Sequence, residues 1–591
     1  MAQMDKSILD YLKEYSTEVL PINKLLVSAF LNFKDIKKVK NLQIQSLIIT
    51  NKKIDERMIL NNFLQLLGNK KQEICFEELL ELFEFVISPS DKLINGAIYT
   101  PKNIRNYITN QSFNSLKSKP LNDIKIADIS CGCGGFLISA SKQIKEKTQK
   151  PFKDIFKENI FGVDIQSYSV DRTKILLSLL AITENEDEKE FEFNLHTGNS
   201  LDFNWAIENK NFERFDLILG NPPYVYSRNM DEQTKTLIKN WPVCSTGHPD
   251  LYIPFFQIGY ELLNENGVLG FITVNTFMHS VNGRALREYF SKNNISLKII
   301  DFKDAQIFKS RTTYTCLCFL QNKESKYVNY IALNKDSLID IDTIKFSQNL
   351  YENLDSWSGW SVRDYNLIKK MESVGTRFGD IYDTKSGIAT LRNKVYIFKP
   401  SKAKGKYFYM QDDTKIEKSI CKDIVNSNKI NQENNIEDLK EKVIFPYIYN
   451  EDNKATLIKE EDFLKDFPSA YKYLQKHRQG LDSRDKGNGK YPAWYAFGRS
   501  QSLEKIQHKL LFPRMVKEGF TIEISNDPDL YFYNGMSAQI KKNGDLNKLK
   551  KLLTSESTWK YIENKCKYYA SGYFGLGKNY LDNLGCVKHL K

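Results

Sequence analysis

Between residues 91 and 325, six short apolar runs alternate with longer amphipathic segments, and this alternation constrains the fold more than any other feature of the chain. Strands that alternate with helices form a mostly parallel sheet with helices on both faces. We therefore predict a doubly wound α/β domain in this part of the chain. The segment TTYTCLCFLQN at 312–322 predicts one more strand, antiparallel and at an edge of the sheet. The six apolar runs occupy residues 124–130, 159–165, 191–197, 215–221, 267–275 and 296–302.

The parts of the chain on either side of this domain have other patterns. Apolar residues recur at three- and four-residue intervals in residues 1–90, which predicts a helical packing or interaction region. A chain of 591 residues suggests about three or four domains. We expect a helical region at 1–90, the α/β domain at 91–325, a connection at 326–360 and a mixed α+β domain at 361–591.

The net charge is unevenly distributed along the chain. Residues 1–360 carry 43 basic and 44 acidic side chains, whereas residues 361–591 carry 42 and 29, so the whole excess of +12 lies in the C-terminal part. Such asymmetry suggests a polyanionic partner for that part. The alternative is a lysine-rich composition with solvated faces. No basic amphipathic helix stands out, which disfavours a membrane surface.

Several classes of protein are disfavoured by composition. The sequence contains no stretch of eighteen or more apolar residues, which argues against a membrane span. Its N-terminus lacks the apolar core of a secretory signal. The nine cysteines and six histidines are scattered without zinc-ribbon spacing. We therefore expect no disulfide scaffold, no Cys/His metal site and a reducing cytoplasmic compartment.

Two motifs in the α/β domain predict a ligand site at the ends of neighbouring strands. DISCGCGGF at 128–136 follows a strand and opens a helix, and its glycines permit a tight turn and close approach to a ligand. It has no Gly-Lys-Ser/Thr, and Asp128 suits a cationic amine better than a pyrophosphate. In FGVDI at 161–165, Asp164 ends the next strand, where a carboxylate can accept both hydroxyl protons of a ribose. A tight structural turn and an ordinary strand-end carboxylate are the alternatives.

The third motif, FDLILGNPPY at 215–224, decides the interpretation. Two prolines fix the turn and donate no N–H, so the turn is rigid and its carbonyl groups stay available. The Asn221 amide oxygen and the Pro222 carbonyl can accept both protons of a planar NH2 group. Tyr224 then offers a flat face for stacking. A strand, this turn and an upstream glycine loop at this spacing would rarely coincide without function.

Together these residues resemble the amino-group methyltransferases that use S-adenosyl-L-methionine. The order of glycine loop, NPPY and basic C-terminal domain is similar to that of γ-type DNA adenine-N6 methyltransferases, which include the TaqI-like and Eco57I-like modification enzymes and the orphan sporulation-associated adenine methylase of clostridia. The resemblance is strong over about residues 91–325 and looser beyond. It implies a Rossmann-like methyltransferase sheet, a C-terminal target-recognition domain, and methyl transfer to adenine N6 at specific sites in double-stranded DNA, with the target base flipped out of the helix.

The resemblance also assigns roles to further segments. GAIYTPKNI at 96–104 resembles the segment that closes over the methionine part of the cofactor, and Asp128 matches the residue that holds the cofactor amine. Asp164 matches the ribose binder. Asn199 stands where the family often has an aspartate facing the cofactor's adenine. IFKSRTTYT at 307–315 resembles the loop whose aromatic residue stacks on the flipped base.

The expected site can then be stated in full. The catalytic residues are Asn221, Pro222, Pro223 and Tyr224, and the residues stacking on the target base are Tyr224 and Phe308, with Tyr314 as the alternative to Phe308. The cofactor-binding residues are Tyr99, Thr100, Pro101, Asp128, Ser130, Cys131, Gly132, Gly134, Phe136, Asp164, Ile165, Asn199, Ser200, Asn221 and Asp250, the last from DLYIPFF at 250–256.

The C-terminal part is expected to recognise the DNA sequence. Residues 490–503, 509–515 and 557–581 resemble segments of TaqI-like specificity regions. Double-stranded DNA is the expected partner, with no membrane, no metal and a monomeric chain, and the sequence leaves open whether a cognate restriction endonuclease exists. The expected DNA-contacting residues are Arg392, Arg478, Arg484, Arg499 and Arg514.

Three other functions remain alternatives at this point. NPPY would serve an RNA adenine or a protein glutamine as well as a DNA adenine, since each presents a planar NH2 group. The chain could also be the methylase part of a restriction–modification enzyme, although residues 1–90 show no nuclease motif. A non-catalytic DNA-binding module would have no need for both an intact NPPY and a glycine loop.

Overall fold

The computed structural model divides into two compact units, Met1–Arg363 and Asp364–Lys591. Within the part of the chain that is described, no helix has both the length and the apolar character that a membrane span requires. The described residues are 6–50, 54–69, 74–85, 99–116, 119–208, 214–308, 314–333, 343, 345–430, 436–487 and 489–586.

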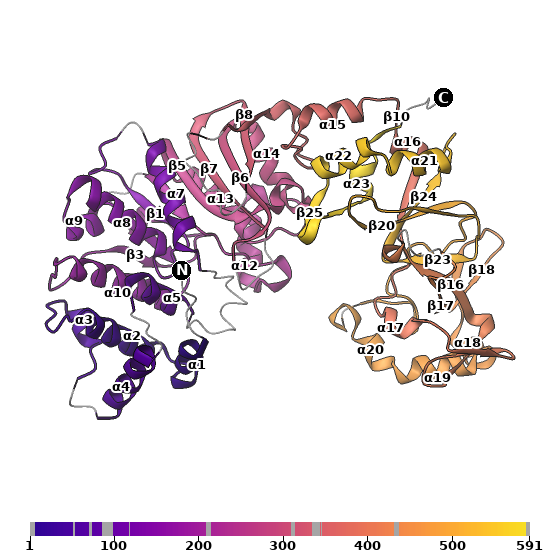
Figure 1. Ribbon diagram of the computed structural model, residues 1–591, viewed down its shortest axis with the longest axis horizontal. Helices are drawn as coiled ribbons and strands as arrows, with labels where there is room; N and C mark the ends of the chain where they lie inside the picture. The colour runs from indigo at the N-terminus through magenta and orange to yellow at the C-terminus, as the bar shows by residue number, and fades with distance from the viewer. Residues whose placement is uncertain are drawn as a thin grey trace. The chain divides into compact units, whose positions relative to one another are not determined.

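A nine-stranded sheet organises the first unit, with strand order β3-β2-β1-β4-β5-β7-β6-β8-β9 (Figure 1). Pairing is parallel from β3 through β5, and β7 runs antiparallel between β5 and β6. Each of the six predicted apolar runs overlaps one of these strands, and β5 and β6 extend beyond their runs, so the mostly parallel α/β sheet is confirmed. The strands are β1 (Ile126–Asp128), β2 (Ile160–Asp164), β3 (Asn194–Thr197), β4 (Phe215–Gly220), β5 (Leu263–Val274), β6 (Ile295–Gln306), β7 (Tyr314–Glu324), β8 (Tyr327–Ala332) and β9 (Ser347–Leu350).

Two expectations about this sheet differ from the structure. β7 is internal rather than at an edge, because it pairs antiparallel with β5 on one side and with β6 on the other. The chain from 326 to 360, expected to be a connection, contributes β8 and β9 to the same sheet. The sheet therefore extends well beyond residue 325.

Helices cover both faces of the sheet. The connections from β1 to β2 and from β4 to β5 run in opposite directions across it, so right-handed crossovers put α8 and α13 on opposite faces. This arrangement is the doubly wound one that the alternation of strands and helices predicted. The helices around the sheet are α7 (Lys102–Ser115), α8 (Gly135–Thr148), α9 (Phe152–Glu158), α10 (Ser167–Thr183), α13 (Tyr252–Glu261) and α14 (Arg284–Lys292).

The N-terminal helices share one hydrophobic core with the sheet rather than forming a separate body. Figure 1 shows α2 and α5 beside α10, and the buried Arg172 of α10 joins them. Its Nε donates to Asn23 Oδ1 at 3.1 Å and its Nη1 donates to the Phe83 carbonyl at 2.8 Å. The helices are α1 (Lys6–Tyr15), α2 (Val19–Phe33), α3 (Leu42–Ser46), α4 (Ile54–Asn69) and α5 (Phe76–Phe85).

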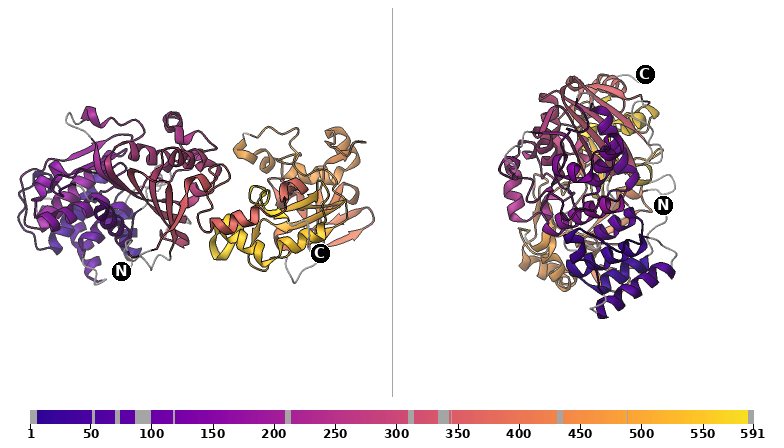
Figure 2. Two further views of the ribbon diagram at one scale, coloured as in Figure 1. Left: turned by 90° about the horizontal axis from the view of Figure 1, so that it is seen from above. Right: turned by 90° about the vertical axis from the view of Figure 1, so that its left-hand side faces the viewer.

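The second unit is built from small, mainly antiparallel sheets with helices packed beside them, and its strands can be followed from two further directions in Figure 2. It has hydrophobic cores of its own. One four-stranded sheet holds β11 (Tyr382–Ser386), β24 (Gly535–Ile540), β20 (Lys509–Pro513) and β22 (Glu523–Ser525), and another holds β12 (Ile397–Phe398), β17 (Lys440–Ile444), β16 (Cys421–Asn426) and β23 (Leu530–Tyr533). The principal helices are α15 (Tyr365–Glu372), α18 (Glu460–Asp466), α19 (Pro468–Lys476), α21 (Leu546–Leu553) and α22 (Glu556–Lys565).

If Arg172 fastens the N-terminal helices to the sheet, Arg172→Met should lower the free energy of unfolding of the first unit by about 2–4 kcal/mol. The substitution leaves the Asn23 and Phe83 acceptors buried without their donors. Denaturant unfolding followed by tryptophan fluorescence measures the change. Asp171→Asn, at an exposed position of the same helix, is the control and should change stability by less than about 0.5 kcal/mol. Equal stabilities of the two variants would contradict the role of Arg172.

Candidate active site

A cavity opens at the carboxyl ends of β1 and β4, where the order of the strands reverses. Asp128 is the last residue of β1, and Asn221 directly follows β4. Such a reversal leaves a crevice between the two loops and is the usual ligand position in an open α/β sheet. The cavity and its mouth enclose about 1310 Å³, and its wall extends from Leu80 to Phe255, entirely within the first unit.

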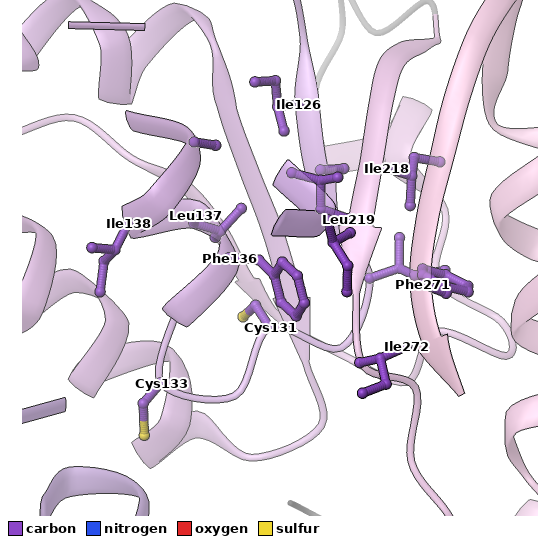
Figure 3. Close-up of a cluster of buried hydrophobic side chains, with 14 of the residues drawn as sticks. Ile126, Cys131, Cys133, Phe136, Leu137, Ile138, Ile218, Leu219, Phe271 and Ile272 are labelled. Carbon is purple, nitrogen blue, oxygen red and sulfur yellow. The ribbon is translucent and has the colours of Figure 1, made fainter. Parts of the chain in front are cut away.

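The glycine loop after β1 forms one wall of the cavity. Gly132 and Gly134 have positive φ values of 52° and 79°, which glycine adopts at low cost. A Cβ on Gly134 would lie 2.5 Å from Thr173 Cγ2, so this glycine permits contact with α10 and does not line the cavity. Beneath the loop, Figure 3 shows Phe136 between Leu137 of the same helix and Leu219 of β4. The loop is thus held against the core from below.

Two carboxylates lie at the ends of β1 and β2. The Asp128 side chain is buried, and its Oδ1 accepts from the Ser130 N–H at 3.0 Å. Burial raises the pKa of Asp128 to about 8, and the negative charges of Asp164 and Glu84 add to this rise. Asp164 Oδ2 accepts from the Gly132 N–H at 3.0 Å, and its pKa is also raised by burial. The hydrogen bond from Gly132 fixes the second carboxylate to the glycine loop.

Asn221 is oriented by a residue from another part of the chain. Its Nδ2 donates to Thr100 Oγ1 at 3.1 Å, and both residues line the cavity. Since the amide nitrogen faces Thr100, the position of the amide oxygen is set as well. The segment 99–101 and the NPPY turn therefore act as one unit, which their separation in sequence did not predict.

The two aromatic residues expected to stack on a target base touch each other. Tyr224 and Phe308 are both buried and meet edge to face, with ring centroids 6.2 Å apart. The Tyr224 hydroxyl donates to the Ile272 carbonyl at 3.1 Å, which fixes the ring. A base held between two parallel rings needs about 7 Å, from two contacts of roughly 3.5 Å. In this conformation the rings leave no such gap, and residues 309–313 of the predicted loop lie outside the described residues.

Helix α5 contributes residues that the sequence did not single out. Glu84 and Leu80 line the cavity, and the Cys133 N–H donates to Glu84 Oε1 at 3.3 Å. Two turns before Glu84, Glu77 accepts the Tyr99 hydroxyl at 2.6 Å and pairs with the buried Arg105 at 2.7 Å. The N-terminal helices thus form part of the cavity wall. FEELLELFEF has the pattern of an ordinary amphipathic helix, which carries no signal for this role.

Most of the expected cofactor-binding residues lie in the wall of this one cavity. Six residues expected at the site lie outside it: Pro101, which precedes α7; Gly134, which packs on α10; the buried Pro222, Tyr224 and Phe308; and Asp250, next to Leu251 of the wall. Tyr314, the alternative to Phe308, lies outside it as well. Residues 96–98 of the predicted 96–104 segment lie outside the described residues. The expected residues in the wall are Tyr99, Thr100, Asp128, Ser130, Cys131, Gly132, Phe136, Asp164, Ile165, Asn199, Ser200, Asn221 and Pro223.

The five arginines expected to contact DNA differ in their surroundings. Arg484 is buried and donates to the carbonyl groups of Leu481, Ala496 and Trp494, so it supports the fold and is withdrawn as a DNA contact. Three are exposed but already bonded: Arg392 to Gly480 and Ser483, Arg478 to Asp482, and Arg499 to Asp485. Arg514 is exposed, and its side chain has no hydrogen bond or ion pair among the described residues.

Comparison with known proteins finds a family match to part of the first unit. Residues 158–308 match the family model described as Eco57I restriction-modification methylase. This part of the chain is therefore similar to that family. The match confirms the Eco57I-like resemblance, and it includes Asp164, the NPPY turn and Phe308.

Individual relatives extend the match beyond this domain. The chain is 26% identical over 539 residues to the type II restriction enzyme and methyltransferase RM.Eco57I of Escherichia coli, covering 79% of this chain and 53% of that protein. It is 23% identical over 487 residues to the type II methyltransferase M.BanIII of Aneurinibacillus aneurinilyticus, covering 74% and 78%. The chain thus spans about half the length of RM.Eco57I and most of M.BanIII.

A solved structure shares the fold. The type IIL restriction-modification enzyme MmeI, determined in complex with DNA, matches with a TM-score of 0.63 and 11% identity. The match covers 98% of this chain and 86% of that one. At this identity the likeness concerns the fold alone.

The wall of the cavity fits S-adenosyl-L-methionine, the methyl donor of such enzymes. Asp128 is a buried carboxylate whose raised pKa reflects the lack of a compensating cation, which an ammonium group would supply. Ser130 Oγ is buried and has no hydrogen-bond partner in the described part of the chain. Asp164 can accept from ribose hydroxyls, as a strand-end carboxylate does in related nucleotide sites. The carboxylates Glu84 and Asp231 add negative charge, which suits a cofactor that carries a sulfonium as well as an ammonium group.

The raised pKa of Asp128 predicts that cofactor affinity passes through a maximum near pH 8. Below about pH 8, Asp128 must lose its proton to hold the cationic amine. As the pH increases toward 8, the affinity for the cofactor should therefore rise by up to tenfold per pH unit. Above it, the cofactor's own α-amino group, with an ordinary pKa of about 7.7–8.0, becomes neutral. Isothermal titration calorimetry between about pH 6 and pH 9 measures this profile. Asp128→Asn should lose the rising limb, whereas Asp202→Asn, at an exposed position, should keep it. A rising limb retained in Asp128→Asn would contradict the assignment.

Proposed function

We propose that this protein is a sequence-specific DNA methyltransferase that transfers the methyl group of S-adenosyl-L-methionine to adenine N6 in double-stranded DNA. One observation carries the proposal: the Asn221 amide, oriented by Thr100, lies in the wall of the same cavity as the Asp128 and Asp164 carboxylates. A group that binds a planar amine and a group that binds a cationic cofactor thus face one space.

The chemistry asked of Asn221 follows from the nature of the target. The lone pair of adenine N6 is delocalised into the ring, so the nitrogen is a poor nucleophile. Hydrogen bonds from both N6 protons to Asn221 Oδ1 and the Pro222 carbonyl would favour a pyramidal nitrogen as positive charge develops. These bonds are stronger in the transition state than in the ground state and therefore lower the barrier.

The other residues would position the reactants. The bound cofactor supplies an electrophilic methyl group on its sulfonium. Asp128 would hold the ammonium end and Asp164 the ribose, so that the transferable group faces the NPPY turn. Positioning of this kind accounts for a large share of the rate enhancement when two reactants must meet in line.

The target base must leave the duplex to reach the turn, because N6 is otherwise stacked and paired. Tyr224 would stack on the flipped base. Phe308 would have to move away from Tyr224 to admit the base between the two rings, since they are 6.2 Å apart and edge to face. We infer that the base pocket opens on DNA binding.

DNA is supported as the substrate by the second unit and by the relatives. Residues 361–591 carry 42 basic and 29 acidic side chains, as expected for a polyanion partner. The relatives with printed activities are type II methyltransferases and restriction enzymes, and MmeI was determined with DNA. RM.Eco57I is described as both a restriction enzyme and a methyltransferase. The proposal therefore includes a cognate restriction function, supplied by a partner or by additional sequence.

The proposal predicts that Asn221→Ala abolishes methyl transfer while cofactor binding persists. Wild type and variant are incubated with labelled S-adenosyl-L-methionine and genomic DNA that lacks adenine methylation, and the product is read by single-molecule sequencing. N6-methyladenine within one short motif, absent from the variant, is the expected result. Transfer to RNA or to a protein fraction instead would overturn the substrate and keep the chemistry, and substantial activity in Asn221→Ala would overturn the role of the amide.

A second prediction concerns the residue that orients this amide. Thr100→Val keeps the shape of the side chain but removes the acceptor of the Asn221 Nδ2 hydrogen bond. Because one such bond contributes about 0.5–1.5 kcal/mol, the rate of the chemical step should fall about three- to tenfold. Single-turnover methyl transfer at saturating cofactor measures this step. Thr100→Ser, which keeps the hydroxyl, is the matched control and should retain most of the rate; equal losses in both would contradict a role for the hydroxyl.

A further inference from the structure

A small lysine-rich sheet stands out on the surface of the second unit. It consists of β13 (Lys402–Lys404), β14 (Tyr407–Tyr409) and β15 (Lys415–Glu417), joined as an antiparallel meander, and is called the basic sheet below. Residues 401–406 are all exposed. Six lysines and three acidic residues lie between residues 399 and 418. The sheet therefore combines exposure with a local excess of positive charge.

The register of the strands groups lysines and tyrosines on one face. Lys402 lies opposite Tyr409, and Tyr409 lies opposite Lys415. Lys404 lies opposite Tyr407, two residues along each strand. Residues opposite each other, and residues two apart on one strand, share a face. One face of the sheet thus carries Lys402, Lys404 and Lys415 beside the rings of Tyr407 and Tyr409, together with the buried Glu417 opposite Tyr407.

The aromatic rings hold the ammonium groups in place. Lys402 Nζ lies 5.0 Å from the centre of the Tyr409 ring, and Lys415 and Lys406 lie 5.0 and 5.4 Å from that of Tyr407. Each cation–π contact is worth about 0.5–1 kcal/mol at an exposed site. A flexible lysine gives up much conformational freedom when it binds a ligand. Rings that restrict the lysines beforehand reduce that loss.

Each acidic residue of this stretch has a partner, and Asp413 neutralises one lysine of the sheet, Lys402. Buried Glu417 accepts the N–H groups of Ser469 and Ala470 at the start of α19, and Asp413 pairs with Lys402 at 2.6 Å. Asp412 accepts the Thr414 N–H at 3.1 Å. In contrast, Lys404, Lys406, Lys415 and Lys418 form no ion pair within the described ranges. Their charge is therefore presented to solvent.

We propose that the basic sheet binds the phosphate backbone of double-stranded DNA, independently of base sequence. Ammonium groups on exposed strands act as point charges toward phosphate oxygens and lack the planar fork with which arginine reads guanine. Neutralising phosphates releases counterions, which supplies a sequence-independent part of the affinity. The proposal rests on the proposed function and assigns its phosphate contacts to lysines rather than to the expected arginines.

The test replaces three of these lysines at once. Lys404→Gln, Lys406→Gln and Lys415→Gln are combined in the full-length chain. The control combines Lys542→Gln, Lys548→Gln and Lys551→Gln, which are exposed in the same unit and change the net charge equally. Fluorescence anisotropy gives the affinity for two unmethylated duplexes, one with and one without the sequence motif that the wild type methylates. Each affinity is measured over a series of salt concentrations. Cofactor affinity is measured alongside.

The basic-sheet variant should bind both duplexes on the order of 100-fold more weakly near physiological salt. Its slope of log affinity against log salt should be shallower by about 2.7, since each phosphate contact contributes about 0.9. The ratio of the two affinities and the affinity for the cofactor should not change. The control should stay close to wild type, because its lysines are placed outside the proposed surface.

Three results would overturn the inference while leaving the methyltransferase proposal intact. The basic-sheet variant could bind DNA as tightly as the wild type, or it could lose no more affinity than the control variant. It could also lose affinity only for the duplex with the motif, which would mean that these lysines contact bases. Failure of the wild type to bind or methylate either duplex would instead overturn the proposed function. As a second variant, Tyr407→Leu with Tyr409→Leu keeps the lysines and removes the rings, and a loss of about three- to tenfold is expected.

Discussion

The buried guanidinium of Arg105 connects the parts of the chain that surround the cavity. It pairs with Glu77 of α5 at 2.7 Å, donates to Ser139 Oγ of α8 at 2.9 Å, and reaches the Thr100 carbonyl at 3.4 Å. Removing one partner of a buried ion pair costs about 3–5 kcal/mol because the other charge stays buried. Since Thr100 also holds the Asn221 amide, the geometry of the NPPY turn depends on a helix far upstream. Arg105, Glu77 and Thr100 are thus the framework on which the site is built.

Electrostatics divide the protein into an acidic cavity and a basic surface. The wall contains Asp128, Asp164, Glu84 and Asp231, whereas its cation, Arg105, is already paired with Glu77. A small cation gains from such a wall, and a phosphate group is repelled by it. The excess of 13 positive charges lies entirely within residues 361–591. The two charge patterns therefore suit two different ligands, a small cation in the cavity and a polyanion on the basic surface.

The sequence predicted what local chemistry imposes and missed what distant contacts create. A strand that runs into Asn-Pro-Pro-Tyr and a glycine loop after another strand can be recognised because each motif is one continuous turn. Glu84 could not be recognised, because every acidic position of an amphipathic helix resembles a solvated one. The sequence gives no reason to distinguish Arg484 from Arg499. In the structure, Arg484 is buried and donates to carbonyl groups, whereas Arg499 is exposed and pairs with Asp485.

The sheet was predictable to a similar degree. The six apolar runs indicated its parallel strands, since continuous apolar segments of that length are typical of strands covered on both faces. The position of β7 inside the sheet depends on strand pairing, which periodicity does not encode. β8 and β9 were missed because only Val328 and Tyr330 of β8 and Asn349 of β9 are buried, so their pattern is weak.

The boundary between Arg363 and Asp364 has an evolutionary consequence. Every residue in the cavity wall precedes it, and the second unit has hydrophobic cores of its own. Substitutions on the surface of the second unit therefore leave the hydrogen bonds of Asn221, Asp128 and Arg105 untouched. If the second unit reads the DNA sequence, as proposed above, a lineage could accumulate such changes and alter the recognised sequence while the cavity stays intact. Selection could then diversify the target without rebuilding the site.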